Sequence, residues 1–206
     1  MKVTKVVLTG GPCAGKSSIL KSVKTRFVEQ GYAVYALPEA ATLFSEAGVD
    51  FLTKDARLSY VTELSKLKYQ LAMENCMNEI AQNCGKPVII VCDRGTMDTS
   101  AYISQEVWQS IKKELNVSDE LLRDQRYDAV IHLCTAAKGA EEFYSLSNNA
   151  CRSESIVFAR VIDDNLIRAW QNHPRYFVVN AEVYFEDKVQ KVMDIIDWLC
   201  EENYGK

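Results

Sequence analysis

The sequence predicts an α/β domain in which one parallel sheet is covered by helices on both faces. Two observations predict this class. Short β-branched and apolar runs alternate with helical stretches along the whole chain, and the run Val88 to Cys92 is apolar throughout. Strand–helix alternation is typical of a parallel sheet, and a continuously apolar strand is typical of a sheet that is buried on both faces. The length of 206 residues suits a single domain over residues 1–206.

Each element has its own local signal. Apolar or β-branched runs between turn residues predict five strands: Val3 to Thr9, Ala33 to Leu37, Val88 to Cys92, Ala129 to Cys134 and Tyr176 to Asn180. Helical spacing of apolar residues predicts helices over Lys16 to Gln30, Ala56 to Asn83, Ser104 to Leu115, Ser118 to Arg123, Ser153 to Asn172, and a closing helix from Phe185 to Leu199. The irregular, polar stretch between the fourth strand and the next helix predicts a lid over about residues 136–153.

Composition limits the classes of function. The 24 basic and 28 acidic side chains leave a net charge of −4, which argues against a nucleic-acid partner because such domains usually carry a basic face. No apolar run approaches the roughly 20 residues that cross a bilayer, and the N-terminus lacks the features of a signal peptide. The seven cysteines have no CxxC spacing, which favours free thiols over disulfides or a metal site. We therefore expect a cytoplasmic protein with no transmembrane segment.

A phosphate-binding loop follows the first strand. Gly10-x-x-x-x-Gly15-Lys16-Ser17 matches the GxxxxGK[ST] pattern, whose glycines let backbone N–H groups surround phosphate oxygens. Lys16 is expected to reach the β and γ phosphates of a nucleoside triphosphate, and Ser17 to hold Mg²⁺. The expected nucleotide contacts are Gly11, Pro12, Cys13, Ala14, Gly15, Lys16, Ser17 and Ser18. A chance match is the alternative, but the strand before the loop and the helix after it are both present.

Charged residues follow the second and third strands. Asp93 comes directly after the buried strand, where an acid can hold Mg²⁺ beside a phosphate loop, although it could also simply begin a turn. Glu39 could be a general base that activates a hydroxyl group, or only an acid in the first turn of a helix. Arg94 could contact the transferring phosphoryl oxygens or pair with a nearby carboxylate.

The lid segment supplies a further candidate. Arg152 suits an arginine that closes over the γ-phosphate, and its alternative is a solvated loop arginine. Weaker candidates are Lys138, Glu154 and Arg160, whereas His132 in an apolar strand and His173 at a helix end are expected to be structural.

Several residue groups resemble known families. The segments Val7-Leu8-Thr9-Gly10-Gly11-Pro12, Pro38-Glu39-Ala40-Ala41 and Cys92-Asp93-Arg94-Gly95, with Asp98 and Tyr102, resemble the AAA-like P-loop domains related to the NadR ribosylnicotinamide kinase domain. The second half is similar to the nucleotide-binding domain of the TRPL translocation defect protein family in Ile131-His132-Leu133, Ala136 to Glu141, Phe143-Tyr144, Ala150 to Glu154, Ala169-Trp170 and His173-Pro174.

These resemblances imply a three-layer, kinase-type P-loop NTPase fold with strand order 2-3-1-4-5 that binds ATP or GTP. The TRPL branch also implies a role in membrane-protein trafficking and contact with phosphoinositides. The arrangement is similar to deoxynucleoside kinases as well. That similarity implies Glu39 as the base, Asp93 and Arg94 as an acid–arginine pair, Arg152 as a lid arginine and Gln70 as a contact of the substrate base.

Two classes of function stay open. A Mg²⁺-dependent small-molecule kinase or NTPase would use Glu39 as base and Ser17 with Asp93 for the metal, and Lys16, Arg94 and Arg152 would stabilise the transferring phosphoryl group. A regulatory GTP-binding module would instead use the nucleotide to change the lid and switch a partner. Against a Ras-like version, the segment after the third strand is not DxxG, and no NKxD follows a strand.

Overall fold

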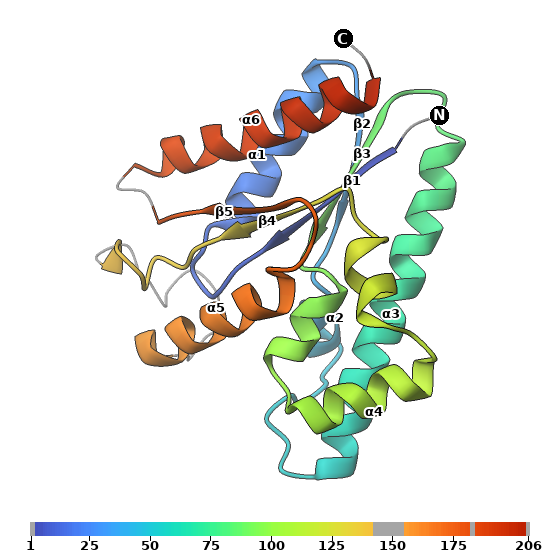
Figure 1. Ribbon diagram of the computed structural model, residues 1–206, viewed down its shortest axis with the longest axis vertical. Helices are drawn as coiled ribbons and strands as arrows, with labels where there is room; N and C mark the ends of the chain where they lie inside the picture. Colours follow the sequence, from blue (N-terminus) through green and yellow to red (C-terminus); the bar gives the residue numbers. More distant parts are fainter. Residues whose placement is uncertain (1–2, 142–154, 182–183, 205–206) are drawn as a thin grey trace.

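A computed structural model describes residues 3–141, 155–181 and 184–204 (Figure 1). Its strands are β1 (Val3–Thr9), β2 (Ala33–Leu37), β3 (Val88–Asp93), β4 (Ala129–Leu133) and β5 (Tyr176–Val179). Its helices are α1 (Lys16–Glu29), α2 (Ala40–Glu46), α3 (Ala56–Gln82), the 3-10 helix η1 (Thr96–Ala101), α4 (Gln105–Leu115), the short π-helix η2 (Glu120–Asp124), α5 (Ile156–Trp170) and α6 (Phe185–Tyr204). All strand pairs are parallel and the order is β2-β3-β1-β4-β5, which confirms the expected fold and strand order.

Successive side chains of β1 pack into opposite layers, as strand geometry requires. Val6 lies in a core cluster with residues of α1 and α6, whereas Val7 lies in a second cluster with residues of α3, α4 and α5. Figure 1 shows the same division, with α1 and α6 on one face of the sheet and α3, α4 and α5 on the other. The residues of β3 also alternate between the two clusters, which explains why the run Val88 to Cys92 is apolar throughout.

Two helices were not expected from the sequence. The helix α2 has seven residues, and only Ala40 among them is buried, so it has almost no periodic apolar signal. The 3-10 helix η1 packs against α5, and nearly all of its residues are buried although most are polar. It therefore has no apolar face that a sequence pattern could reveal. Among the described helices, none combines the length and apolar character that a membrane crossing needs.

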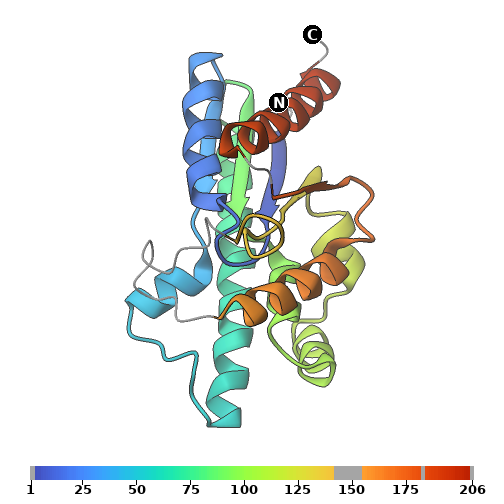
Figure 2. The same cartoon turned by 90° about the vertical axis from the view of Figure 1, so that its left-hand side faces the viewer.

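The loop that leaves β1 lies directly against the end of β4 (Figure 2). A Cβ added to Gly10, whose φ is +136°, would lie 2.0 Å from the carbonyl oxygen of Leu133. Beyond that contact, the Thr135 hydroxyl donates to the Pro12 carbonyl, and the Ala136 N–H donates to the Cys13 carbonyl at 3.3 Å. Only glycine fits this close approach, so Gly10 determines how the loop is placed.

This close approach predicts the cost of a methyl group at Gly10. Gly31 is a matched control because its φ is also positive, at +90°, but its added Cβ would meet nothing within 4 Å. Gly31→Ala should lose only the backbone term, about 1–2 kcal/mol. Gly10→Ala should lose roughly 1–3 kcal/mol more, measured by urea unfolding, because the backbone of β4 must move. Equal losses in the two variants would contradict the close approach.

Candidate nucleotide-binding site

Except for Arg152, which lies outside the described residues, the catalytic residues predicted from the sequence lie at or just beyond the carboxyl ends of three neighbouring strands. Leu8 of β1 pairs with Asp93 of β3, and Leu37 of β2 pairs with Cys92. The phosphate loop, Glu39 and Arg94 therefore follow strands that end side by side. This is the edge at which parallel α/β sheets bind ligands.

The phosphate loop spans the turn between β1 and α1. Gly11, Pro12 and Ala14 are buried, Cys13 and Gly15 are half-buried, and Ser17 and Ser18 are exposed in the first turn of α1. The Lys16 ammonium donates to the carbonyl oxygens of Gly10 at 2.8 Å and Gly11 at 3.1 Å. The first turn of α1 has no acidic residue and no side-chain cap. Its N–H groups and positive dipole end are thus available to an anion.

Glu39 and Arg94 form an ion pair across the ends of β2 and β3. The Arg94 Nε–H donates to Glu39 Oε1, and a second guanidinium nitrogen lies 3.3 Å from Asp98 Oδ2. The Thr42 hydroxyl donates to the other Glu39 oxygen at 3.2 Å. Of the alternatives for Arg94, this structure therefore has the one in which it pairs with a carboxylate. Arg94 also has a φ of +70°, an uncommon backbone conformation for a non-glycine residue.

The two acids of the site differ in pKa. Burial acts to raise the pKa of Glu39, but Arg94 and Lys16 outweigh it and hold that pKa at about 2. The pKa of Asp93 is raised instead, because it is buried and lies near Glu39 and Asp98, which outweighs the opposing effect of Lys16 and Arg94. Asp93 Oδ1 is buried and has no hydrogen-bond partner among the described residues. A carboxylate oxygen in that state fits a divalent cation.

Asp98 is a site residue that sequence reasoning named only as part of a motif. Its carboxylate accepts hydrogen bonds from the Thr9 hydroxyl at 2.9 Å and from the Trp170 indole N–H at 2.6 Å, and it pairs with Arg94. It is almost fully buried. Asp98 therefore joins the end of β1, the helix α5 and the guanidinium that holds Glu39.

Asp163 is a second buried carboxylate, and sequence reasoning missed it. Its Oδ1 accepts the Gly11 N–H at 2.9 Å and the Thr135 N–H at 3.3 Å, and it lies 3.2 Å from the His132 ring. Its pKa is well below the usual range, because His132 and Lys138 outweigh the effect of burial. A signal was present in the sequence: Asp163 follows Ile162 on the face of α5 that its apolar spacing turns toward the core. A carboxylate is rarely buried there without a partner.

Two of the weaker candidates, Lys138 and Arg160, form contacts between the start of the predicted lid and α5. Lys138 pairs with Asp163 at 2.9 Å and with Asp164 at 2.6 Å, and Arg160 donates to the Ala137 carbonyl at 2.6 Å. Arg152, Glu154 and most of the predicted lid lie outside the described residues. His173 contacts the Tyr127 carbonyl at 3.1 Å and accepts the Arg175 N–H at 3.1 Å, where α5 turns into β5.

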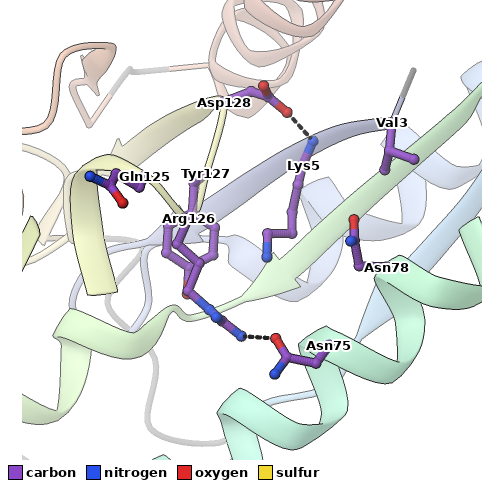
Figure 3. A pocket seen from close by; sticks show the side chains of 8 residues that line it. All are labelled: Val3, Lys5, Asn75, Asn78, Gln125, Arg126, Tyr127 and Asp128. Carbon is purple, nitrogen blue, oxygen red and sulfur yellow. Dashed lines mark hydrogen bonds between the residues drawn. The ribbon is translucent and has the colours of Figure 1, made fainter. Parts of the chain in front are cut away.

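Gln70 is buried on α3 and contacts the back of the site. Its amide donates to Glu74 at 2.7 Å and lies 3.4 Å from the Arg94 carbonyl. Glu74 in turn pairs with Lys5 and Arg126, which line a polar cavity of about 310 Å³ (Figure 3). Because that cavity opens at the amino end of β1, it is separate from the phosphate loop at the carboxyl end.

The chain matches the model of the AAA domain family over residues 5–188. The chain belongs to the AAA domain family. No match was found among the curated proteins. The TRPL translocation defect branch is not shown by the family match and stays an expectation.

Two kinds of kinase share the fold of this AAA domain. One is deoxyadenosine kinase from M. mycoides with the products dCMP and dCDP bound: the identity is 19%, 94% of this chain and 99% of that chain are covered, and the TM-score is 0.62. The other is thymidylate kinase from Ehrlichia chaffeensis, with 16% identity, 95% and 100% coverage and a TM-score of 0.56. At these identities the similarity shows the fold alone.

The lowered pKa of Glu39 predicts a pH-dependent contribution to stability. A depressed pKa means that the pairing stabilises above the unfolded value of about 4.3 and is lost as the pH falls toward 2. The difference in unfolding free energy between the parent chain and Glu39→Gln should thus shrink by about 1–2 kcal/mol from pH 6 to pH 3. Glu46→Gln, at an exposed position on α2, should show no such trend. A difference that is constant with pH would contradict the pairing.

Proposed function

We propose that this AAA domain transfers the γ-phosphoryl group of ATP or GTP to a hydroxyl group of a small, uncharged acceptor. The observation that carries the proposal is the Glu39–Arg94 pair, held at the strand ends beside Lys16. A carboxylate, a guanidinium and a phosphate-loop lysine within electrostatic range of each other supply a base and two cations for phosphoryl oxygens. The kinase-type fold supports the same reaction class.

In the proposed reaction, the backbone N–H groups of residues 13–18 bind the phosphates and Lys16 neutralises charge on the β and γ groups. Ser17 and Asp93 would hold Mg²⁺, whose charge would neutralise the phosphate oxygens and polarise the transferring group. Arg152 would add a cation from the lid. Glu39 would orient the acceptor hydroxyl and accept its proton.

A pKa of about 2 makes Glu39 a weak base while Arg94 is bound to it. If Arg94 turns toward the phosphoryl oxygens, Glu39 loses the strongest of the effects that lower its pKa. Its pKa then rises toward the ordinary range, and its basicity increases when the nucleotide is in place. The Arg94 guanidinium would thus pair with Glu39 before the nucleotide binds and with the phosphoryl oxygens during the reaction.

The charge of the acceptor is inferred from the two cations that lie over the Tyr102 ring, Arg94 and Lys66. Arg94 lies 5.6 Å from its centroid and Lys66 lies 5.9 Å from it. Lys66 pairs with Glu63 at 2.5 Å, and Arg94 pairs with Glu39. In the proposed reaction Arg94 turns to the transferring phosphoryl group, and Lys66 already has a carboxylate partner, so a phosphate on the acceptor would have to displace Glu63. An uncharged acceptor such as a nucleoside fits better than a nucleoside monophosphate.

Removal of the Lys16 ammonium tests nucleotide binding. Lys16→Ala should weaken ATP or GTP binding by about 100-fold, since charge-assisted hydrogen bonds to phosphate are lost, while the unfolding midpoint stays close to that of the parent chain. Calorimetric titration measures the affinity. Lys24→Ala, which removes an exposed lysine further along α1, is the matched control and should bind normally. Equal affinity in Lys16→Ala and the parent chain would refute the nucleotide site.

Activity is tested with Mg-ATP or Mg-GTP and matched panels of nucleosides and nucleoside monophosphates. We expect ADP or GDP to form when a nucleoside is present, and not with the corresponding monophosphate. Glu39→Gln should lower kcat by about 10²–10⁴-fold with little change in the KM for nucleotide, whereas Glu46→Gln should change neither. Nucleotide binding without acceptor-dependent product would refute the phosphotransferase. It would favour the regulatory GTP-binding alternative, including its trafficking and phosphoinositide partners.

A further inference from the structure

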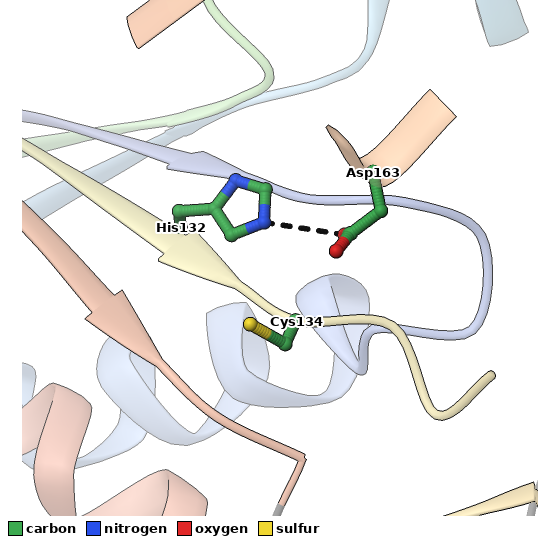
Figure 4. Close-up of side chains that lie close together, drawn as sticks. All are labelled: His132, Cys134 and Asp163. Atoms are coloured by element: carbon green, nitrogen blue, oxygen red, sulfur yellow. Dashed lines mark ion pairs between the residues drawn. The ribbon is translucent and has the colours of Figure 1, made fainter. Parts of the chain in front are cut away.

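Three metal-ligating side chains meet behind the phosphate loop (Figure 4). His132 lies on β4, Cys134 follows the end of that strand, and Asp163 lies on α5. All three are buried, and one ligand atom from each lies within 4.8 Å of the other two. Because His132 and Cys134 are two residues apart on an extended segment, both point to the same side of the sheet. Asp163 meets them from the neighbouring layer.

The histidine at the centre of this cluster lacks ordinary hydrogen bonds. The Nε2 atom of His132 is held by an ion pair with Asp163 Oδ1 at 3.2 Å whose geometry is not that of a hydrogen bond, and its Nδ1 has no hydrogen-bond partner among the described residues. The Cys134 thiol donates a weak hydrogen bond to the Asn180 side-chain oxygen, at 3.8 Å. A fully buried imidazole without a hydrogen bond is costly unless another partner satisfies it.

We propose that His132, Cys134 and Asp163 bind a zinc-class divalent ion. A nitrogen, a sulfur and an oxygen donor together match the ligand preference of zinc, whereas magnesium and calcium prefer oxygen donors alone. Around a tetrahedral zinc ion the ligand atoms lie about 3.3–3.8 Å apart. Separations of up to 4.8 Å would therefore close by about 1 Å when the ion binds.

Lys138 is the cation that pairs with Asp163 in this cluster, and it has a second carboxylate partner outside the cluster. Lys138 lies 2.9 Å from Asp163 Oδ2, where it competes with a metal ion, but it also lies 2.6 Å from Asp164. It can keep the second carboxylate while Asp163 turns to the ion. Asn180 is exposed, and its side-chain oxygen, next to the Cys134 sulfur, marks a route of entry and a fourth ligand.

The ion would lie against the phosphate loop. Asp163 accepts the Gly11 N–H, and Thr135, the residue after Cys134, donates to the Pro12 carbonyl. Figure 4 shows the loop passing beside Asp163. An ion that fixes the three ligands therefore also fixes two backbone anchors of the loop, and it does so whether or not the phosphotransferase proposal holds.

Cobalt(II) is the probe, because a cobalt–thiolate bond gives a charge-transfer band in the near ultraviolet. We expect one Co²⁺ per full-length chain with this band under reducing conditions, and displacement of Co²⁺ by Zn²⁺. Cys134→Ser should lose the band. Cys200→Ser is the matched control: this cysteine is also buried, but it lies on α6, and the band should be kept. No band in the parent chain, or a band that survives in Cys134→Ser, would overturn the site.

Thermal unfolding gives a second readout. Zn²⁺ at about 100 times its Kd should raise the unfolding midpoint by roughly 5–10 °C in the parent chain and in Cys200→Ser. It should raise it much less in Cys134→Ser and in His132→Gln. If His132→Gln does not fold, the cysteine pair still decides the result. A shift of equal size in Cys134→Ser would show binding elsewhere and overturn the assignment.

Discussion

The Arg94 guanidinium holds two carboxylates, Glu39 and Asp98, at the point where three strands end. Its backbone N–H donates to the Leu8 carbonyl at 3.0 Å, and its positive φ turns the chain there. Breaking a buried ion pair costs roughly 3–5 kcal/mol, which exceeds the roughly 1–3 kcal/mol of backbone strain at Arg94. Glu39 and Asp98 are therefore linked to each other through this one side chain.

The helix α5 is the second element on which the site depends. Its Trp170 donates to Asp98, which pairs with Arg94, and its Asp163 holds Gly11 of the phosphate loop. The first contact lies at the C-terminal end of α5 and the second lies near its middle. Because α5 follows the predicted lid, a displacement of the helix would alter the acceptor side and the phosphate side together. A shared rigid element is a physical means of coupling two halves of a site.

The residues that sequence reasoning brought together are those whose positions follow from strand geometry. The carboxyl ends of parallel strands align, so a loop after β1, an acid after β2 and an acid–arginine pair at the end of β3 had to meet. The strand order itself came from family resemblance. Asp98 and Asp163 lie on helices, and their roles depend on how α5 packs across β1 and β4, which no local pattern encodes. The CxxC rule likewise had no means to find Cys134, because its partners are contributed by a strand and a helix.

The charge at the strand ends has a consequence for the nucleotide. Among the described residues, the cations that act on the carboxylates Glu39 and Asp93 are Lys16 and Arg94, and Asp98 adds a third negative charge beside them. A triphosphate that entered alone would add negative charge to a cluster that already has an excess of it. The raised pKa of Asp93 reports the same excess, because Glu39 and Asp98 add to the effect of burial there. A divalent cation at Asp93 Oδ1, which has no hydrogen-bond partner among the described residues, would remove the conflict, so nucleotide and metal should bind to this site together.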